Sequence, residues 1–248
     1  MPYANNAGTR IYYEVEGSGP PLVLQHGTMG SAANWRIVGW ADALKDLRQL
    51  ILIDARGHGK SDKPHDPAAY PLSARVGDVT AVLDALGHQT ADYMGYSMGG
   101  WIGFGLAHHA PKRVRSMLLG GAHPFAENMQ AMRDQQVSDP ALLRASSQKQ
   151  YGTYFKEELV ENQIANDFIA VRALTQDRSS FADVLPKMTM PCFLYCGAAD
   201  PRLERMRECA ETMPDARLHV LPGCDHTLVM ARSDLVLPAM RAFLSGQG

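Results

Sequence analysis

The stretch Gly95-Tyr96-Ser97-Met98-Gly99-Gly100 decides how this chain of 248 residues is expected to fold. It follows the apolar residues 90–94, which predict a buried strand, and it opens a helical stretch over residues 98–109. A Gly-x-Ser-x-Gly sequence between a strand and a helix is typical of a nucleophile elbow, a tight turn that lifts the serine hydroxyl above the sheet. The glycines at 95 and 99 indicate backbones that approach too closely for a side chain. A glycine-rich turn with an incidental serine is the competing interpretation.

A serine nucleophile needs a histidine as its base and a carboxylate that orients the histidine. After an elbow of this kind the carboxylate comes first along the chain and the histidine second. Residues 190–196 predict a buried strand with Asp200 in the loop after it, and residues 217–221 predict a later strand that leads to His226. We therefore predict Ser97 as the nucleophile, His226 as the base and Asp200 as the orienting carboxylate.

The acid has two rival interpretations. Asp200 precedes Pro201 and, taken alone, is an ordinary turn residue. Asp225 is the other candidate acid, but as the direct neighbour of His226 it cannot easily turn its carboxylate onto that ring. The strand predicted at 114–119 offers no carboxylate, because Gly120-Gly121-Ala122-His123 follows it. Asp200 is thus the best candidate.

A second chemical element follows the strand predicted at residues 22–25. Acyl transfer requires donors for the oxyanion, usually one backbone N–H after the nucleophile and one from the loop after an early strand. Met98 supplies the first by its position, and Thr28, which follows His26-Gly27, is our candidate for the second. His26 is expected to support this loop. Nucleotide binding is not indicated, since the loop has neither Gly-x-Gly-x-x-Gly nor a Walker lysine.

The order of elements predicts an α/β protein. Strands are expected at residues 9–16, 22–25, 49–53, 90–94, 114–119, 190–196 and 217–221, after a short first one, and helices at 32–47, 72–86, 98–109, 203–213 and 233–244. Alternating strands and helices imply a mostly parallel sheet of about eight strands with helices on both faces. The predicted site residues all follow strands, at the carboxyl edge of that sheet.

The chain resembles the α/β-hydrolase superfamily. The resemblance rests on His26-Gly27, on Asp54-Ala55-Arg56-Gly57-His58-Gly59-Lys60-Ser61-Asp62, on the elbow at Ser97, on Gly197-Ala198-Ala199-Asp200 and on Gly223-Cys224-Asp225-His226. It is most similar to small carboxylesterases, enol-lactonases and carbon-carbon bond hydrolases of that family. The resemblance implies an α/β-hydrolase fold and a Ser-His-Asp triad.

Residues 124–186 differ from the rest of the chain, because strand signals disappear and amphipathic helical stretches replace them. We predict a helical cap inserted into a core formed by residues 1–123 and 187–248. Such a cap would exclude water and line the substrate pocket. Our candidate pocket residues, all large and aromatic, are Tyr151, Tyr154, Phe155 and Phe168.

Composition restricts the class of partner. A formal net charge of −2 gives no reason to expect nucleic acid or an anionic membrane surface. The first residues lack a basic region followed by an apolar core, so a cytoplasmic location is expected. The cysteines at 192, 196, 209 and 224 match no zinc pattern, which favours buried free thiols.

Together these features predict a serine hydrolase that cleaves a small-molecule carboxylic ester or lactone through an acyl-enzyme, without a metal or organic cofactor. Two alternatives use the same residues. One is a carbon-carbon bond hydrolase or a cofactor-free oxygen enzyme. The other is a ligand receptor or regulator that keeps the triad, because a fold does not determine a function.

Overall fold

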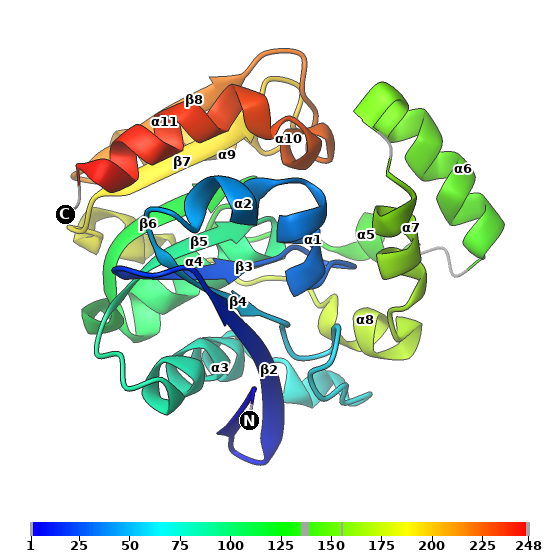
Figure 1. Cartoon of the computed structure of the whole chain (residues 1–248), viewed down its shortest axis with the longest axis horizontal. Helices are drawn as coiled ribbons and strands as arrows, with labels where there is room; N and C mark the ends of the chain where they lie inside the picture. Colours follow the sequence, from blue (N-terminus) through cyan, green and yellow to red (C-terminus); the bar gives the residue numbers. More distant parts are fainter. Residues whose placement is uncertain (1, 135–138, 155, 247–248) are drawn as a thin grey trace.

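The computed structural model describes residues 2–134, 139–154 and 156–246, and its strands form one sheet in the order β1-β2-β4-β3-β5-β6-β7-β8 (Figure 1). The strands are β1 (Tyr3–Asn6), β2 (Thr9–Glu16), β3 (Pro21–Gln25), β4 (Gln49–Ile53), β5 (Ala91–Tyr96), β6 (Val114–Gly120), β7 (Cys192–Gly197) and β8 (Ala216–Leu221). Strands β1 and β2 are antiparallel at one edge, and the strands from β4 through β3 to β8 pair in parallel. The predicted mostly parallel sheet of eight strands is confirmed.

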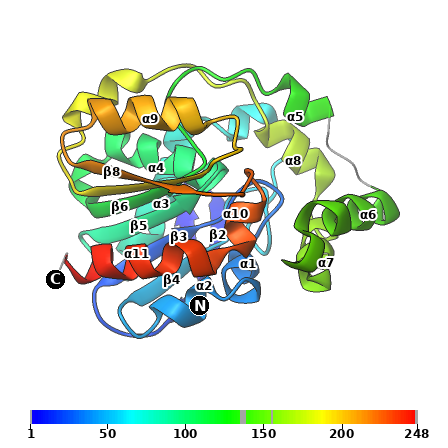
Figure 2. The same ribbon diagram turned by 90° about the horizontal axis from the view of Figure 1, so that it is seen from above.

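Helices cover both faces of this sheet, so that all six residues of β5 are buried. One face is covered by α3 (Leu72–Ala85), α4 (Met98–His109) and α9 (Leu203–Thr212), and the other by α1 (Ala32–Ile37), α2 (Trp40–Leu44) and α11 (Ser233–Ser245). Figure 2 shows α4 and α9 on one side and α2 and α11 on the other. Each face has its own apolar cluster, with Phe104 and Met206 in the first and Trp35 and Trp40 in the second.

The described helices between residues 130 and 174 stand to one side of the sheet (Figures 1 and 2), within a stretch, residues 124–186, that we call the 124–186 segment. Its described part contains α5 (Gln130–Asp134), α6 (Pro140–Tyr151), α7 (Glu157–Ile164), α8 (Phe168–Leu174) and the 3-10 turns η3 (Gly152–Tyr154) and η4 (Ala182–Lys187), the last of which ends one residue beyond it. The two ends of the segment meet where Glu127 and Arg178 exchange backbone hydrogen bonds of 3.0 and 2.9 Å. The segment therefore leaves and rejoins the core at one place.

The helix expected over residues 32–47 is instead two short helices. Gly39 lies between them with a φ of 81°, a left-handed conformation that ends one helix and starts the next. The last helix contains Pro238 without ending there. A further short helix, α10 (Leu228–Ala231), and the 3-10 turns η1 (Pro67–Ala69) and η2 (Pro111–Arg113) were not expected from the sequence. The four cysteines are buried free thiols, as predicted.

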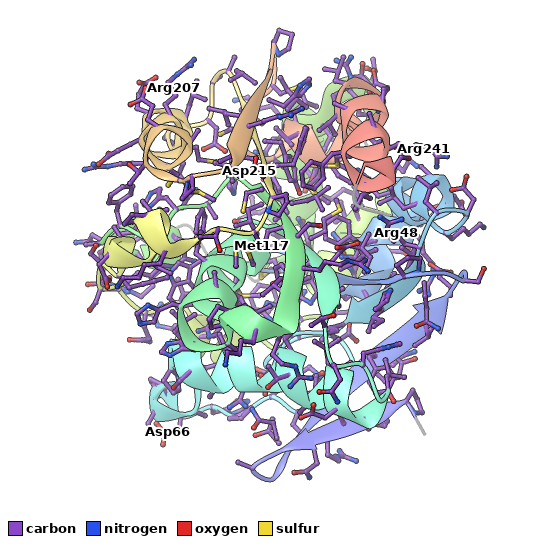
Figure 3. All side chains as sticks on the ribbon, turned by 90° about the vertical axis from the view of Figure 1, so that its left-hand side faces the viewer. Arg48, Asp66, Met117, Arg207, Asp215 and Arg241 are labelled. Atoms are coloured by element: carbon purple, nitrogen blue, oxygen red, sulfur yellow. The ribbon has the colours of Figure 1, made fainter. Side chains whose placement is uncertain are left out.

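The amino ends of the central strands are held by a buried ion pair. Arg48, just before β4, donates its Nε–H to Asp92 Oδ2 at 2.9 Å and its Nη2 to the Leu244 carbonyl at 2.5 Å. Ser116 and Arg115 of the neighbouring strand also donate to Asp92. Arg48 is labelled in Figure 3, which shows the molecule from the side opposite α6. This cluster links β4, β5, β6 and α11, while the loops at the opposite ends of the strands are left to form a site.

Candidate active site

Ser97 lies in a sharp turn between β5 and α4. Its φ of 54° and ψ of −113° are a strained conformation for a residue with a side chain. Its backbone N–H donates to the Gly120 carbonyl at 2.8 Å, which fixes the turn against β6. A Cβ at Gly99 would lie 2.0 Å from the Gln25 carbonyl oxygen, and one at Gly95 would lie 2.3 Å from the Gly99 carbonyl oxygen. The turn therefore needs glycine at both positions, as the sequence predicted.

His226 lies in the loop after β8 and faces the serine. Its Nε2 is 2.9 Å from Ser97 Oγ, and its Nδ1 is 2.6 Å from Asp200 Oδ2. The carboxylate can only accept, so Nδ1 carries the proton and Nε2 is free to accept the serine O–H. Tyr96 packs against the His226 imidazole. Its hydroxyl donates to the His226 carbonyl, and its ring centroid lies 5.3 Å from the imidazole centroid.

Asp200 follows β7, and its side chain is fully buried. The Oδ1 atom, which His226 does not use, accepts the Arg202 backbone N–H at 2.9 Å. Burial alone would raise the pKa of Asp200, but the hydrogen bond and charge of His226, together with Arg202, outweigh burial and lower it. Asp225, the rival acid, instead accepts the backbone N–H groups of Thr227 and Leu228 at 2.9 and 2.8 Å. Asp225 therefore orders the start of α10 and does not contact the imidazole.

The loop after β3 brings Thr28 beside the serine. A Cβ added to Gly27 would lie 3.2 Å from Ser97 Cβ, so this backbone passes directly over the elbow. Within the described residues, the backbone N–H groups of Thr28 and Met98 have no hydrogen-bond partner, which leaves both as donors for an oxyanion.

Two buried histidines hold this loop in place. His26 Nδ1 is 2.7 Å from the Gly27 carbonyl oxygen, and its Nε2 accepts the Ala55 backbone N–H at 3.0 Å. His58 Nε2 accepts the Met29 backbone N–H at 3.2 Å. Burial lowers the pKa of both imidazoles, which are therefore neutral, as an acceptor nitrogen requires. Both therefore shape the Thr28 loop, and in the described structure neither forms a hydrogen bond with Ser97.

Residues 20–153 match a family model described as the alpha/beta hydrolase fold. The chain belongs to the α/β-hydrolase family. An esterase from Rhodococcus sp. ECU1013 superposes on this α/β-hydrolase with a TM-score of 0.84 and 25% identity, over 100% of both chains. The enol-lactonase from Burkholderia xenovorans LB400 has a TM-score of 0.83 and 23% identity over 98% of this chain and all of its own, which shows the shared fold. The predicted resemblance to the family and to its esterases and enol-lactonases is thus confirmed.

One relative found by sequence aligns with a smaller part of the chain than these structures do. The 2-hydroxymuconate semialdehyde hydrolase of a Pseudomonas species is 37% identical over 133 residues, which are 51% of this α/β-hydrolase and 46% of that protein. The alignment thus spans less than half of the relative's length. In the described part of the chain, none of the helices has the length and apolar character needed to cross a bilayer.

Two cavities of the α/β-hydrolase meet at Thr28. The smaller, of about 180 Å³, is lined by Ser97, His226 and Thr28 together with Tyr151 of α6. The larger, of about 420 Å³, is lined by Thr28, Met98 and residues of α3, α4 and the 124–186 segment. Of the two candidate oxyanion donors, Thr28 therefore lies where the cavities adjoin, and Met98 lines the larger one.

The four aromatic residues expected in the pocket are not grouped together. Tyr151 is buried and lines the smaller cavity. Tyr154 is 40% exposed and packs under the Arg232 guanidinium, 5.0 Å from the ring centroid, so it lines neither cavity. Phe168 also lines neither, because α8 presents Leu174 to the larger cavity and Phe168 stands at its opposite end. Phe155 lies outside the described residues.

Sequence reasoning did not assign roles to Tyr96 or Arg202, which contact His226 and Asp200 respectively. Tyr96 stands inside the elbow motif, and Arg202 follows the acid by two residues, so both were close to predicted site residues. No local pattern distinguishes them from ordinary core or surface residues. The contacts of Tyr96 with His226 and of Arg202 with Glu127 form only when the fold brings distant parts of the chain together.

Proposed function

We propose that this α/β-hydrolase is a serine hydrolase that cleaves a small-molecule carboxylic ester or lactone through an acyl-enzyme. The observation that carries the proposal is the continuous hydrogen-bonded path from Ser97 Oγ through both nitrogens of His226 to Asp200, at 2.9 and 2.6 Å. Such a path gives a serine hydroxyl its base and gives the base its orientation. The unpartnered N–H groups of Thr28 and Met98 add the electrostatic element that acyl transfer needs.

In the first half of the reaction, Ser97 Oγ attacks the carbonyl carbon and its proton passes to His226 Nε2. The carbonyl oxygen becomes an oxyanion, which the Thr28 and Met98 N–H groups bind. Asp200 stabilises the imidazolium that forms, as an ionised carboxylate with a lowered pKa can. His226 then gives its proton to the leaving alkoxide, and the acyl group remains on Ser97.

In the second half, water enters on the side that the alcohol has left. His226 Nε2 takes a proton from this water as the water oxygen attacks the acyl carbon, and the same two N–H groups hold the second oxyanion. Collapse of this intermediate returns the proton to Ser97 Oγ and releases the acid. Apart from the substrate and this water, every group that acts in these steps belongs to the chain.

The test combines turnover with active-site labelling. Wild type should hydrolyse p-nitrophenyl acetate or butyrate and take up one fluorophosphonate per chain. Ser97→Ala should lose both, with a fall in kcat of about 10⁶ by analogy with a serine protease. Ser18→Ala, which removes an exposed hydroxyl from the turn before β3 and outside both cavities, is the matched control and should keep both properties. Turnover by Ser97→Ala, or wild type that no fluorophosphonate labels, would refute the proposal.

A further inference from the structure

Arg75 is a buried cation without a countercharge. Arg75 lies on α3 and is only 6% exposed. Its Nε–H donates to the Tyr70 carbonyl at 3.1 Å, and its Nη2 donates to the Leu174 carbonyl at 2.6 Å. Both partners are neutral, and among the described residues no carboxylate lies within ion-pair distance of this guanidinium. Burial of a charge is unfavourable unless the charge is paired, so this arrangement requires an explanation.

The other buried arginines of the core show the usual arrangement. Arg48 pairs with Asp92 at 2.9 Å, and Arg56 pairs with Asp78 through two hydrogen bonds of 2.7 and 2.6 Å. Arg75 differs from them in a second respect, because it lines the cavity of about 420 Å³. Among the described residues its Nη1 has no hydrogen-bond partner, and this atom is not fully buried, so its N–H groups stay open to solvent. The other cavity that Arg75 lines measures only about 10 Å³ and is too small for a ligand.

A second guanidinium adds to the positive charge of this cavity. Both Arg75 and Arg178 contact the Trp101 ring, with guanidinium carbons 5.4 and 4.6 Å from its centroid. Arg178 pairs with Glu127 at 3.0 Å, but Glu127 also pairs with Arg202, so one carboxylate serves two cations. Burial lowers the pKa of Arg75 to about 9, which still leaves it protonated at neutral pH.

One carboxylate also lines the cavity, but it is already engaged. Asp177 Oδ1 accepts the Met129 backbone N–H at 2.9 Å and forms an ion pair of 2.9 Å with Arg133. The side chain of Asp177 is 60% exposed, at the outer rim. The inner end of the cavity therefore carries the uncompensated charge of Arg75.

The cavity also reaches the proposed catalytic centre. Thr28 and Met98, the two candidate oxyanion donors, form part of its wall. Trp101 follows Ser97 by one helical turn, and its backbone N–H donates to the Ser97 carbonyl at 2.9 Å. The wall of the cavity thus runs along α4 from Met98 to Trp101 and includes Arg75, whose guanidinium carbon lies 5.4 Å from the Trp101 ring centroid.

We propose that the larger cavity binds the acyl part of a substrate whose far end is a carboxylate, and that Arg75 recognises this carboxylate. The placement of the acyl part rests on the proposed serine hydrolase function. A guanidinium with free N–H groups matches the geometry of a carboxylate, and such charge-assisted hydrogen bonds are stronger than neutral ones. The substrate class is thus a half-ester of a dicarboxylic acid or a lactone that bears a carboxylate.

The kinetic test compares p-nitrophenyl half-esters of C4 to C8 diacids with p-nitrophenyl esters of the neutral acids of equal length. Wild type should favour the half-ester at the length that spans the cavity. Arg75→Met should lower kcat/KM for that half-ester about 10- to 100-fold more than for its neutral counterpart, mainly through KM. Arg75→Lys should recover part of the preference. Arg172→Met, which removes an exposed cation from the same side of the molecule, should leave the preference unchanged.

A binding measurement separates this inference from the proposed function. Ser97→Ala should bind monomethyl adipate more tightly than methyl hexanoate in calorimetry, and adding Arg75→Lys should reduce that difference. If no ester is cleaved but this difference is found, the anion site stands and the hydrolase proposal fails. If esters are cleaved but wild type shows no preference for any half-ester, the anion site is refuted. An equal loss on both substrates in Arg75→Met and Arg75→Lys would assign Arg75 a structural role and also refute it.

Discussion

Arg202 contacts Asp200, the proposed acid, through its backbone N–H, which donates to Oδ1 at 2.9 Å. The Arg202 guanidinium extends in the other direction and pairs with Glu127 at the base of the 124–186 segment. Glu127 also pairs with Arg178 at 3.0 Å, where the segment rejoins the core. The loop that carries the acid is therefore tied to the point where the segment is attached.

Glu127→Gln should destabilise the protein. The substitution leaves the largely buried Arg178 and Arg202 without their shared carboxylate, and breaking a buried pair from one side costs about 3 kcal/mol or more. Urea unfolding followed by circular dichroism measures the change in free energy of unfolding. Glu208→Gln, which breaks the exposed pair with Arg205, is the control and should cost less than about 1 kcal/mol. Equal effects would mean that the Glu127 cluster contributes no more than a surface pair.

Asp200→Asn should reduce kcat by about 10⁴, because an amide in place of the carboxylate favours the wrong tautomer of His226. Asp225→Asn should have a far smaller effect, since its carboxylate binds only the N–H groups at the start of α10. Steady-state hydrolysis of a p-nitrophenyl ester by both variants measures the difference. The reverse ranking would move the role of acid to Asp225.

The ionisation of Asp200 should also appear in the pH dependence of stability. Its pKa in the folded state lies below the ordinary value of 3.8, so its stabilisation is fully present above that value and is lost as the pH falls through the folded pKa. The difference in free energy of unfolding between wild type and Asp200→Asn should therefore shrink as the buffer is taken from about pH 4 to more acidic values. A difference that grows as the pH falls would contradict the lowered pKa.

The Thr28 loop can be tested through its backbone. Thr28→Pro removes the N–H donor and should lower kcat/KM about a hundredfold, which corresponds to roughly 3 kcal/mol of transition-state stabilisation, plus any loop distortion. Thr28→Ala keeps the N–H and should be nearly as active as wild type. Full activity of Thr28→Pro on the same ester would place the second donor elsewhere.

The sequence predicted the sheet, the elbow and the spatial meeting of Ser97, Asp200 and His226 because each depends on local patterns and on a fixed order of strands. It did not predict that Gly39 divides a helix. A glycine that ends a helix in the left-handed conformation cannot be distinguished, in the sequence alone, from a glycine inside a continuous helix. The residues that line the pocket could be predicted even less well from the sequence. An aromatic residue in a helical stretch can face a cavity, as Tyr151 does at the end of α6, or a neighbouring cation, as Tyr154 does in η3, and tertiary packing alone decides between them.

This difference between Tyr151 and Tyr154 leads to a prediction about the alcohol part of the substrate. The smaller cavity is lined by His226, which protonates the leaving alkoxide in the proposed mechanism, so the alcohol is expected to lie there beside Tyr151. Tyr151→Ala should therefore shift the preference among alkyl acetates of increasing alcohol length, because each methylene group that packs in the cavity is worth about 1 to 3 kcal/mol. Tyr154→Ala removes the same side chain outside the cavity and should leave the profile unchanged. Relative kcat/KM from methyl to hexyl acetate measures both, and a shift in Tyr154→Ala as large as that in Tyr151→Ala would show that the alcohol binds elsewhere.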